Sequence, residues 1–134
     1  MTLASADILE YVLPGDWRVL AGRTDAANDH LSLELARPAD LWFHIRGMPG
    51  SHVILRVPPG ETPDRPTRER AAGIAAYHSK ARSAGTVAVT CTEARHVSKP
   101  RGAKPGTVAI RKETVLKVRP PDETAVAAWL TPPP

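Results

Sequence analysis

The side chains best suited to binding chemistry lie in a basic loop at residues 95–104, which reads R-H-V-S-K-P-R-G-A-K. The loop holds four lysines and arginines and no acidic residue. Prolines within and just after it restrict the backbone, and two nearby glycines let a polyanion approach the chain closely. Lysine and arginine on a stiff loop can contact successive phosphates of a nucleic acid, in a salt-dependent mode that reads no sequence. The candidate phosphate contacts are Lys99, Arg101 and Lys104, and the alternative is a basic surface loop without a ligand.

A second candidate is the turn at residues 47–52, G-M-P-G-S-H, which lies between two strand-like runs. It brings backbone N–H groups close to Ser51 and His52, and Arg46 directly precedes it. Such a turn can cradle a phosphate group. The alternative is a tight hairpin in which the glycines meet backbone demands and His52 has a structural role.

Two histidines flank this turn, because His44 and His52 lie on either side of it and can face each other across a hairpin. A metal site would need a third ligand, and no cluster of cysteine and histidine has zinc spacing. His78 and His96 lie in other segments, with nothing that ties them to His44. We therefore expect no metal and no cofactor, and histidines that form hydrogen bonds in the interior or beside a ligand.

Nucleophilic side chains are present but lack the sequence surroundings of catalysis. None of Ser51, Ser79 and Ser98 lies in a G-x-S-x-G elbow, and the sequence has no P-loop and no G-x-G-x-x-G motif. Cys91 closes an apolar run and is expected as a small buried side chain. The chain is predicted not to be an enzyme.

Positive charge is concentrated in one part of the chain. Eleven lysines and arginines and two acids fall within residues 65–112, whereas the rest of the chain holds seven lysines and arginines and twelve acids. This asymmetry favours a basic face offered to an anionic partner. Its alternative is a solvated surface with scattered arginines. Aromatic residues make up only 4% of the chain, which argues against base stacking on a broad aromatic platform.

Around these groups the hydrophobic pattern predicts an α+β fold, a single small domain with a mostly antiparallel sheet of about six or seven strands and one long helix packed on it. The helix covers residues 67–84, where small apolar side chains recur at helical spacing and Gly85 follows as a stop. The run at 52–57 is expected to be buried on both faces of the sheet. Strand-forming runs lie at residues 17–22, 31–35, 40–44, 52–57, 86–91, 107–110 and 114–118, the last two as a hairpin.

The ends of the chain are predicted to be peripheral: an N-terminal extension at residues 1–16, the domain at 17–120, and a proline-rich, poorly ordered tail at 121–134. No apolar run approaches the roughly 20 residues of a membrane span, and residues 1–6 lack the features of a signal peptide. The single cysteine permits no intramolecular disulfide, which fits a reducing compartment. We expect a cytoplasmic protein with no membrane partner.

Two blocks of sequence, taken together with shorter pieces in the same order, resemble the NFACT-R family. The first block is D-L-W-F-H at residues 40–44 with P-G-S-H-V at 49–53, and the second is K-P-x-G-A-x-P-G at 99–106. The resemblance spans about residues 17–120. The shorter pieces are Gly22 with Arg23, Asn28 with Asp29, Leu31, residues 71–72, 75–77 and 79–82, Val97, Val118 and Pro120.

The resemblance implies an RNA-binding module without catalytic residues or a cofactor. In the family this module is usually the C-terminal part of a longer protein that engages stalled large ribosomal subunits and peptidyl-tRNA. The tRNA-engaging region, helix-hairpin-helix portion and coiled-coil arm of the longer members have no counterpart in these residues, so we expect a binding module and not a complete quality-control factor. One of Trp42 and Phe43 would lend an aromatic face. The implied ligand-facing residues are Arg23, Asn28, His44, Ser51, His52, Lys80, Arg82, Lys99, Arg101 and Lys104.

Three other functions remain open at this point. The basic face can dock on an acidic or ribosomal protein, which makes the chain a protein-interaction adaptor. DNA is an alternative ligand, because only contacts to the 2′-OH would distinguish RNA from DNA. The third is an enzyme that processes nucleic acid, which only the basic loop together with His44 and His52 would support. The favoured prediction is a module for tRNA or rRNA, including RNA of the large ribosomal subunit.

Overall fold

A six-stranded antiparallel sheet in the order β1-β2-β4-β3-β5-β8 forms the centre of the structure, a computed structural model that describes residues 7–131. A second sheet pairs β6 with β7. The predicted α+β class and strand number are confirmed. The strands are β1 (Ile8–Leu13), β2 (Trp17–Gly22), β3 (Leu41–Ile45), β4 (Val53–Leu55), β5 (Val87–Glu93), β6 (Val97–Ser98), β7 (Ala109–Ile110) and β8 (Thr114–Val118). The helical segments are α2 (Asp25–His30), the π-helix η1 (Leu31–Leu35), α3 (Arg65–Tyr77), the 3-10 turn η2 (Ala94–His96) and α4 (Glu123–Trp129).

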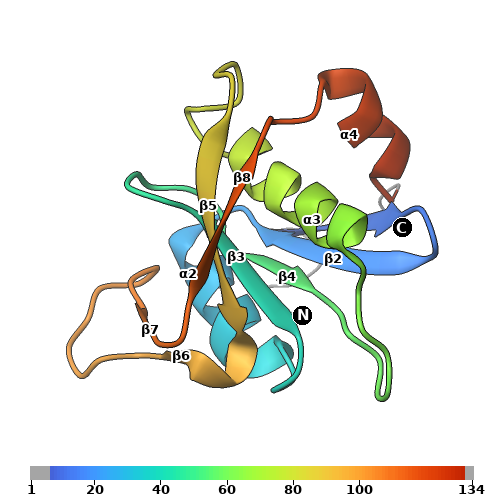
Figure 1. Cartoon of the computed structure of the whole chain (residues 1–134). Helices are drawn as coiled ribbons and strands as arrows, with labels where there is room; N and C mark the ends of the chain where they lie inside the picture. Colours follow the sequence, from blue (N-terminus) through green and yellow to red (C-terminus); the bar gives the residue numbers. More distant parts are fainter. Residues whose placement is uncertain (1–6, 132–134) are drawn as a thin grey trace.

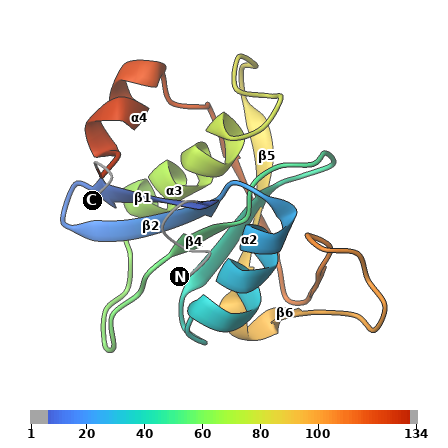
Figure 2. The same cartoon turned by 180° about the vertical axis from the view of Figure 1, so that it is seen from behind.

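The sheet separates two apolar cores. Helix α3 crosses one face of the sheet (Figure 1), and α2 with η1 covers the other, as the view from behind shows (Figure 2). Alternation along β3 sends Phe43 into the core beneath α3 and Trp42 into the core beneath η1. All three residues of β4 are buried, so the prediction of a strand covered on both faces is confirmed.

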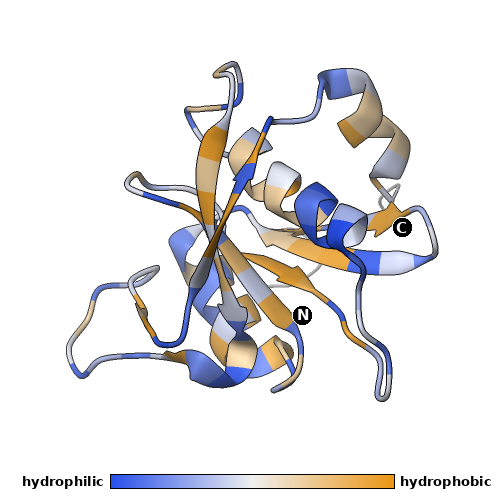
Figure 3. Cartoon of the chain, viewed as in Figure 1, coloured by the Kyte–Doolittle hydropathy of each residue, from blue (hydrophilic) through white to orange (hydrophobic). Residues whose placement is uncertain are grey.

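Helix α3 is shorter than predicted and starts two residues earlier. The Asp64 side chain caps it by accepting from the Thr67 N–H at 2.9 Å. Its first turns are hydrophilic and the later ones apolar (Figure 3), with alanines fully buried against the sheet. The predicted extension to residue 84 is wrong, because the chain leaves the helix after Tyr77 and Ser79 pairs with Gly50 instead. Its 13 residues make α3 the longest described helix, but not the single long helix predicted.

Residues 31–35 form the π-helix η1, so the strand predicted there is wrong. Thr24 caps α2 by accepting from the Ala27 N–H at 3.0 Å, and the helical path continues through η1. The alternating leucines that imitated a strand include Leu31 and Leu35, which are four residues apart. Both reach the core around Trp42 from one side of the helix.

The hairpin predicted for residues 107–118 is also wrong. Its first strand pairs with β6 as β7, and its second pairs with β5 as β8. The Thr92 hydroxyl donates to the Arg111 carbonyl at 2.7 Å, and Lys112 takes a φ of +56°. The segment between the two strands therefore carries the chain from one sheet to the other.

Both flanks contribute to the fold, which corrects their prediction as peripheral segments. In β1, Tyr11 and Leu13 are almost completely buried, and in α4 Val126 packs into the same core. The Thr131 N–H donates to the Glu10 carbonyl at 2.8 Å, which joins the end of α4 to β1. The expectations for residues 1–6 and 132–134 lie outside the described residues. Among the helices of residues 7–131, none combines the length and apolar character needed to cross a bilayer.

Candidate nucleic-acid interface

An open pocket of about 410 Å³ lies where the chain leaves α3, between that exit, the start of α2 and the turn before β4. We call it the phosphate pocket. Its lining combines cations, hydroxyl groups and the backbone of Gly50. Five of the predicted ligand-facing residues meet here from three separate segments: Arg23, Asn28, Ser51, Lys80 and Arg82.

The charge of the phosphate pocket comes from three exposed cations, Arg23, Lys80 and Arg82. None of them forms an ion pair with any residue within 7–131. The guanidinium of Arg82 lies 4.3 Å from the centre of the Tyr77 ring, a cation–π contact that orients it. Asp25 is the acid in the lining, so the pocket keeps a net positive charge and favours an anion.

The turn at residues 47–52 is held tightly against its neighbours. A Cβ on Gly50 would come within 2.8 Å of Ile45 Cγ2, so a side chain at this position has no room. Asn28 is buried, and its Oδ1 accepts from the His52 N–H at 3.0 Å. Asn28 therefore lines the pocket mainly as a support for the turn, and Ser51 is presented at the pocket surface.

His44 and His52 face each other as predicted, with ring centres 5.6 Å apart, but His52 is buried and His44 is half-buried. Because the Gly106 carbonyl only accepts, Nε2 of His52 carries the proton and donates to it over 3.1 Å. Its Nδ1 then accepts from the Ser32 hydroxyl at 2.8 Å. Burial, together with nearby His44, lowers the pKa of His52 to about 4. Burial also lowers the pKa of His44, so both rings are neutral at neutral pH and neither is a phosphate-binding cation.

No aromatic ring is presented for stacking at this site. Phe43 is fully buried under α3, and Trp42 is 3% exposed, with its Nε1 donating to the Ser32 hydroxyl at 3.0 Å. The expectation that one of the two would lend an aromatic face is wrong, because the sheet has a core on each side. The residues of this interface thus offer charge and hydrogen bonds to a ligand.

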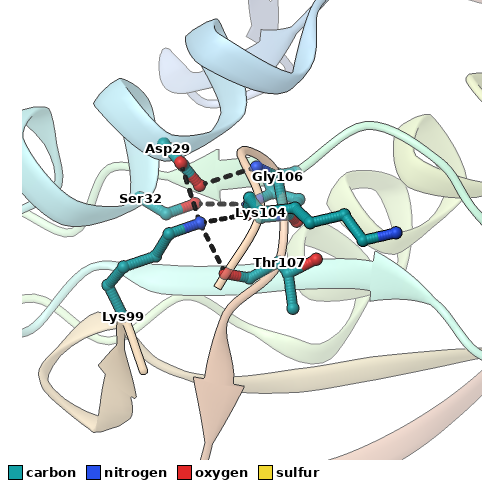
Figure 4. Close-up of polar contacts among 7 residues, drawn as sticks. Asp29, Ser32, Lys99, Lys104, Gly106 and Thr107 are labelled. Atoms are coloured by element: carbon teal, nitrogen blue, oxygen red, sulfur yellow. Dashed lines mark hydrogen bonds and ion pairs between the residues drawn. The ribbon is translucent and has the colours of Figure 1, made fainter. Parts of the chain in front are cut away.

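Lys99 holds the base of the basic loop in place (Figure 4). The Lys99 ammonium donates to the carbonyls of Lys104 and Thr107, and it lies 3.0 Å from the Asp29 carboxylate of α2. The same carboxylate accepts from the Gly106 N–H at 3.0 Å. Lys99 therefore holds the loop in shape instead of projecting toward a ligand, while the Lys104 side chain extends away from this cluster in Figure 4.

The remaining predicted cations differ in position. Arg101 and Lys104 are exposed and form no ion pair with any residue in the described part of the chain. Gly106 lies against Asp25, so the end of the loop reaches the rim of the phosphate pocket. Arg46 is also exposed, but it is not part of the pocket lining.

Sequence reasoning missed several residues of this site. Thr24 and Ser79 line the pocket, and the pattern of Thr24 followed by an acid and two alanines is a helix start that could have revealed α2. His78 also lines the pocket and hydrogen-bonds the Tyr11 hydroxyl at 2.6 Å, across 67 residues of sequence. Nothing in the local pattern of either residue signals that pair.

The chain is similar to known proteins over most of its length. It is 40% identical over 108 residues to the Rqc2 homolog RqcH of Bacillus subtilis and 38% identical over 105 residues to that of Streptococcus suis. These matches cover 81% and 78% of this chain but 18% and 19% of the relatives, so the chain spans about a fifth of their length.

A solved structure and a family model extend the comparison. The C-terminal part of the fibronectin/fibrinogen-binding protein from Streptococcus suis superposes with a TM-score of 0.86 at 32% identity, covering 97% of this chain and 51% of that one. A model of the NFACT protein RNA binding domain matches residues 9–112, which include the phosphate pocket and the basic loop. With the sequence, the fold and both predicted motif blocks in agreement, this chain belongs to the NFACT protein RNA binding domain family.

Proposed function

We propose that this chain is a non-catalytic RNA-binding module that holds structured RNA by its phosphates at the phosphate pocket and along the basic loop. The observation that carries the proposal is the meeting of Arg23, Lys80 and Arg82 around one open pocket without acidic partners. Cations left unpaired in a structured pocket are suited to neutralising an external anion. The family to which the chain belongs supports RNA as that anion.

The basic loop extends this surface and is already shaped for contact. Lys99, Asp29 and Gly106 fix its base, so Arg101 and Lys104 are presented with little conformational entropy left to lose. The absence of an exposed aromatic platform at this site favours recognition of folded RNA by shape and phosphate position, since single-stranded ligands are usually held by base stacking. The proposed ligands are tRNA or rRNA in the cytoplasm, including RNA of stalled large ribosomal subunits, as membership of the NFACT protein RNA binding domain family suggests.

Two features support a binding role without catalysis. Both ring nitrogens of His52 are engaged within the molecule, so His52 has no nitrogen available as a general base. Burial raises the pKa of the Cys91 thiol to about 11, which keeps it protonated and a poor nucleophile. His52 and Cys91 are two of the side chains that the sequence offered as candidates for catalysis.

Fluorescence anisotropy of labelled tRNA and of an rRNA fragment, at several salt concentrations, tests the proposal. We expect affinity that falls steeply with salt, and a Lys80→Glu/Arg82→Glu variant that binds at least about tenfold more weakly with a smaller salt slope. Arg37→Glu is the matched control, because Arg37 is an exposed cation outside the pocket. Duplex DNA of matched length reports whether the 2′-OH matters. Absent or salt-insensitive binding to every RNA would overturn the proposal.

A further inference from the structure

A second pocket, of about 390 Å³, lies between α3, the end of β8 and α4. We call it the α3–β8–α4 groove. It sits beside the N-terminal half of α3, whereas the phosphate pocket lies beyond the C-terminal end of that helix. Its β8 and α4 residues follow residue 112, so they lie outside the segment that the family model matches. The groove therefore shares no lining residue with the phosphate pocket, although its α3 residues lie within the matched segment.

The lining of the groove is both cationic and apolar. Arg70, Lys117 and Arg119 supply three cations, none of which forms an ion pair with another residue in the described part of the chain. Pro66, Pro121 and Trp129 supply apolar surface. The Trp129 ring is partly buried against the main core, so it forms a wall of the groove and is not an exposed platform. A fitting ligand carries negative charge and an apolar side chain together.

The acid in the groove does not cancel this charge. Glu69 lies 3.2 Å from Arg65 one helical turn earlier, which already compensates it. Arginine forms bidentate hydrogen bonds with carboxylates, and two arginines are present among the three cations. The groove is therefore complementary in charge to the carboxylates of aspartate and glutamate, which its arginines can bind in bidentate fashion.

The floor of the groove continues into an open sheet edge. β8 is the last strand of the six-stranded sheet and pairs only with β5. Lys117 and Val118, the last two residues of β8, line the groove. An extended polypeptide can add to such an edge as a further strand, through the regular main-chain hydrogen bonds of a β-ladder.

We propose that the α3–β8–α4 groove docks an acidic, extended segment of a partner protein, whose apolar side chain packs against Trp129 while its carboxylates pair with Arg70, Lys117 and Arg119. The combination of unpaired cations, an apolar wall and an adjacent strand edge carries this inference. The chain then has two faces, one for RNA and one for a protein, and binding at either does not require the other.

A set of fluorescein-labelled peptides, each an extended run of glutamates around one central Phe, Leu or Val, tests the groove by anisotropy. We expect at least one to bind the intact chain and to weaken about tenfold or more with Lys117→Glu/Arg119→Glu, because both changes replace attraction by repulsion at exposed positions. Peptides with glutamine in place of glutamate, or with glycine at the centre, should bind weakly. Shifts of the β8 amide signals in NMR spectra should accompany binding.

A crossed pair of variants separates this inference from the proposed RNA function. Lys80→Glu/Arg82→Glu should weaken RNA binding and leave peptide binding intact, and Lys117→Glu/Arg119→Glu should do the reverse. Binding of none of the acidic peptides to the wild-type chain would overturn the inference. So would a loss of RNA affinity in Lys117→Glu/Arg119→Glu as large as its loss of peptide affinity, because RNA would then be the ligand of the groove.

Discussion

The backbone N–H and both ring nitrogens of His52 form hydrogen bonds within the molecule. Its backbone N–H is bound by Asn28, its Nδ1 by Ser32 and its Nε2 by Gly106. One residue thereby joins α2, the turn before β4 and the basic loop. The sequence placed His52 at the site, but among ligand-facing residues, because a P-G-S-H motif does not reveal whether its histidine points outward. That distinction depends on the core around Trp42, to which η1 contributes Leu31 and Leu35.

We predict that acid destabilises the fold through buried histidines. Burial lowers the pKa of both His52 and His78 to about 4. Between that value and the ordinary pKa near 6.5, the unfolded chain binds more protons than the folded one, so stability is complete above about pH 6.5 and falls as the pH drops toward 4. We expect a loss of a few kcal/mol per histidine at full protonation.

Urea denaturation at a series of pH values between 7.5 and 4 measures this loss. A His78→Phe variant removes one of these groups and should reduce the pH dependence of the unfolding free energy. A free energy of unfolding that is constant across this pH range would contradict the buried, neutral state of both rings.

We predict that Lys99 stabilises the basic loop and that Lys104 contacts RNA directly, although both are lysines of the same loop. Lys99→Met removes the pairing with Asp29 and two carbonyls, so it should lower stability by about 1 kcal/mol. RNA affinity should also fall because the loop loosens, with the salt slope nearly unchanged. Lys104→Met should leave stability unchanged and reduce the salt slope by about 1. Denaturation and salt-dependent anisotropy of the two variants test this, and the same slope change in both would contradict it.

At the scale of elements, most strands of the central sheet and helix α3 were predictable, whereas β1, α2 and η1 were not. The runs that form β2, β3, β4 and β5 contain enough apolar and β-branched residues to be recognised as strands. The prediction for η1 was wrong because leucines that recur every two residues also lie four residues apart, so the same residues fit both the strand period and the helix period. The pairing of β7 with β8 was predicted wrongly for another reason. Two strand-like runs joined by three residues imply a hairpin locally, but each found its partner elsewhere in the chain.

Two glycines, one in the basic loop and one just after it, allow a matched test of how closely this segment must approach α2. Gly102 and Gly106 both have positive φ, +76° and +87°, but a Cβ on Gly102 would meet open space while one on Gly106 would come within 2.7 Å of Asp25 Oδ1. Gly102→Ala should cost only the backbone strain of about 1 kcal/mol.

Gly106→Ala should cost more, because the alanine adds the steric contact to the same strain, and it should also weaken RNA binding by displacing the loop from the pocket. Denaturation and anisotropy of both variants provide the comparison. Equal effects of the two substitutions would show that the packing of Gly106 on α2 does not hold the loop in place.

On the scale of the whole molecule, the charge asymmetry along the sequence did not predict which cations stay unpaired or how they group. Arg65, Arg95 and Lys99 of the basic segment form ion pairs. The basic segment at residues 65–112 supplies Lys80 and Arg82 to the phosphate pocket, Arg101 and Lys104 to the basic loop, and Arg70 to the α3–β8–α4 groove. Arg23 completes the phosphate pocket from outside that segment. Such groupings depend on which loops the sheet brings together, and therefore on a strand order that local sequence does not encode.

The flanks show the same dependence on the complete fold. Tyr11 in β1 hydrogen-bonds His78 at the pocket, and Trp129 in α4 forms a wall of the groove. Sequence analysis assigned both segments to peripheral ends because neither has a strong periodic pattern of its own. Each gains its place by covering an edge of the core that the central segments leave exposed.

The most direct test of the account is to crosslink bound tRNA or rRNA to the chain with ultraviolet light and to identify the crosslinked peptides by mass spectrometry. We predict crosslinks in the peptides that contain Arg23, Ser51, Lys80 with Arg82, and Arg101 with Lys104, and their loss at high salt. Crosslinks confined to the peptides around Arg70 and Lys117 to Trp129, or none that respond to salt, would contradict the assignment of the phosphate pocket and basic loop as the RNA-binding surface.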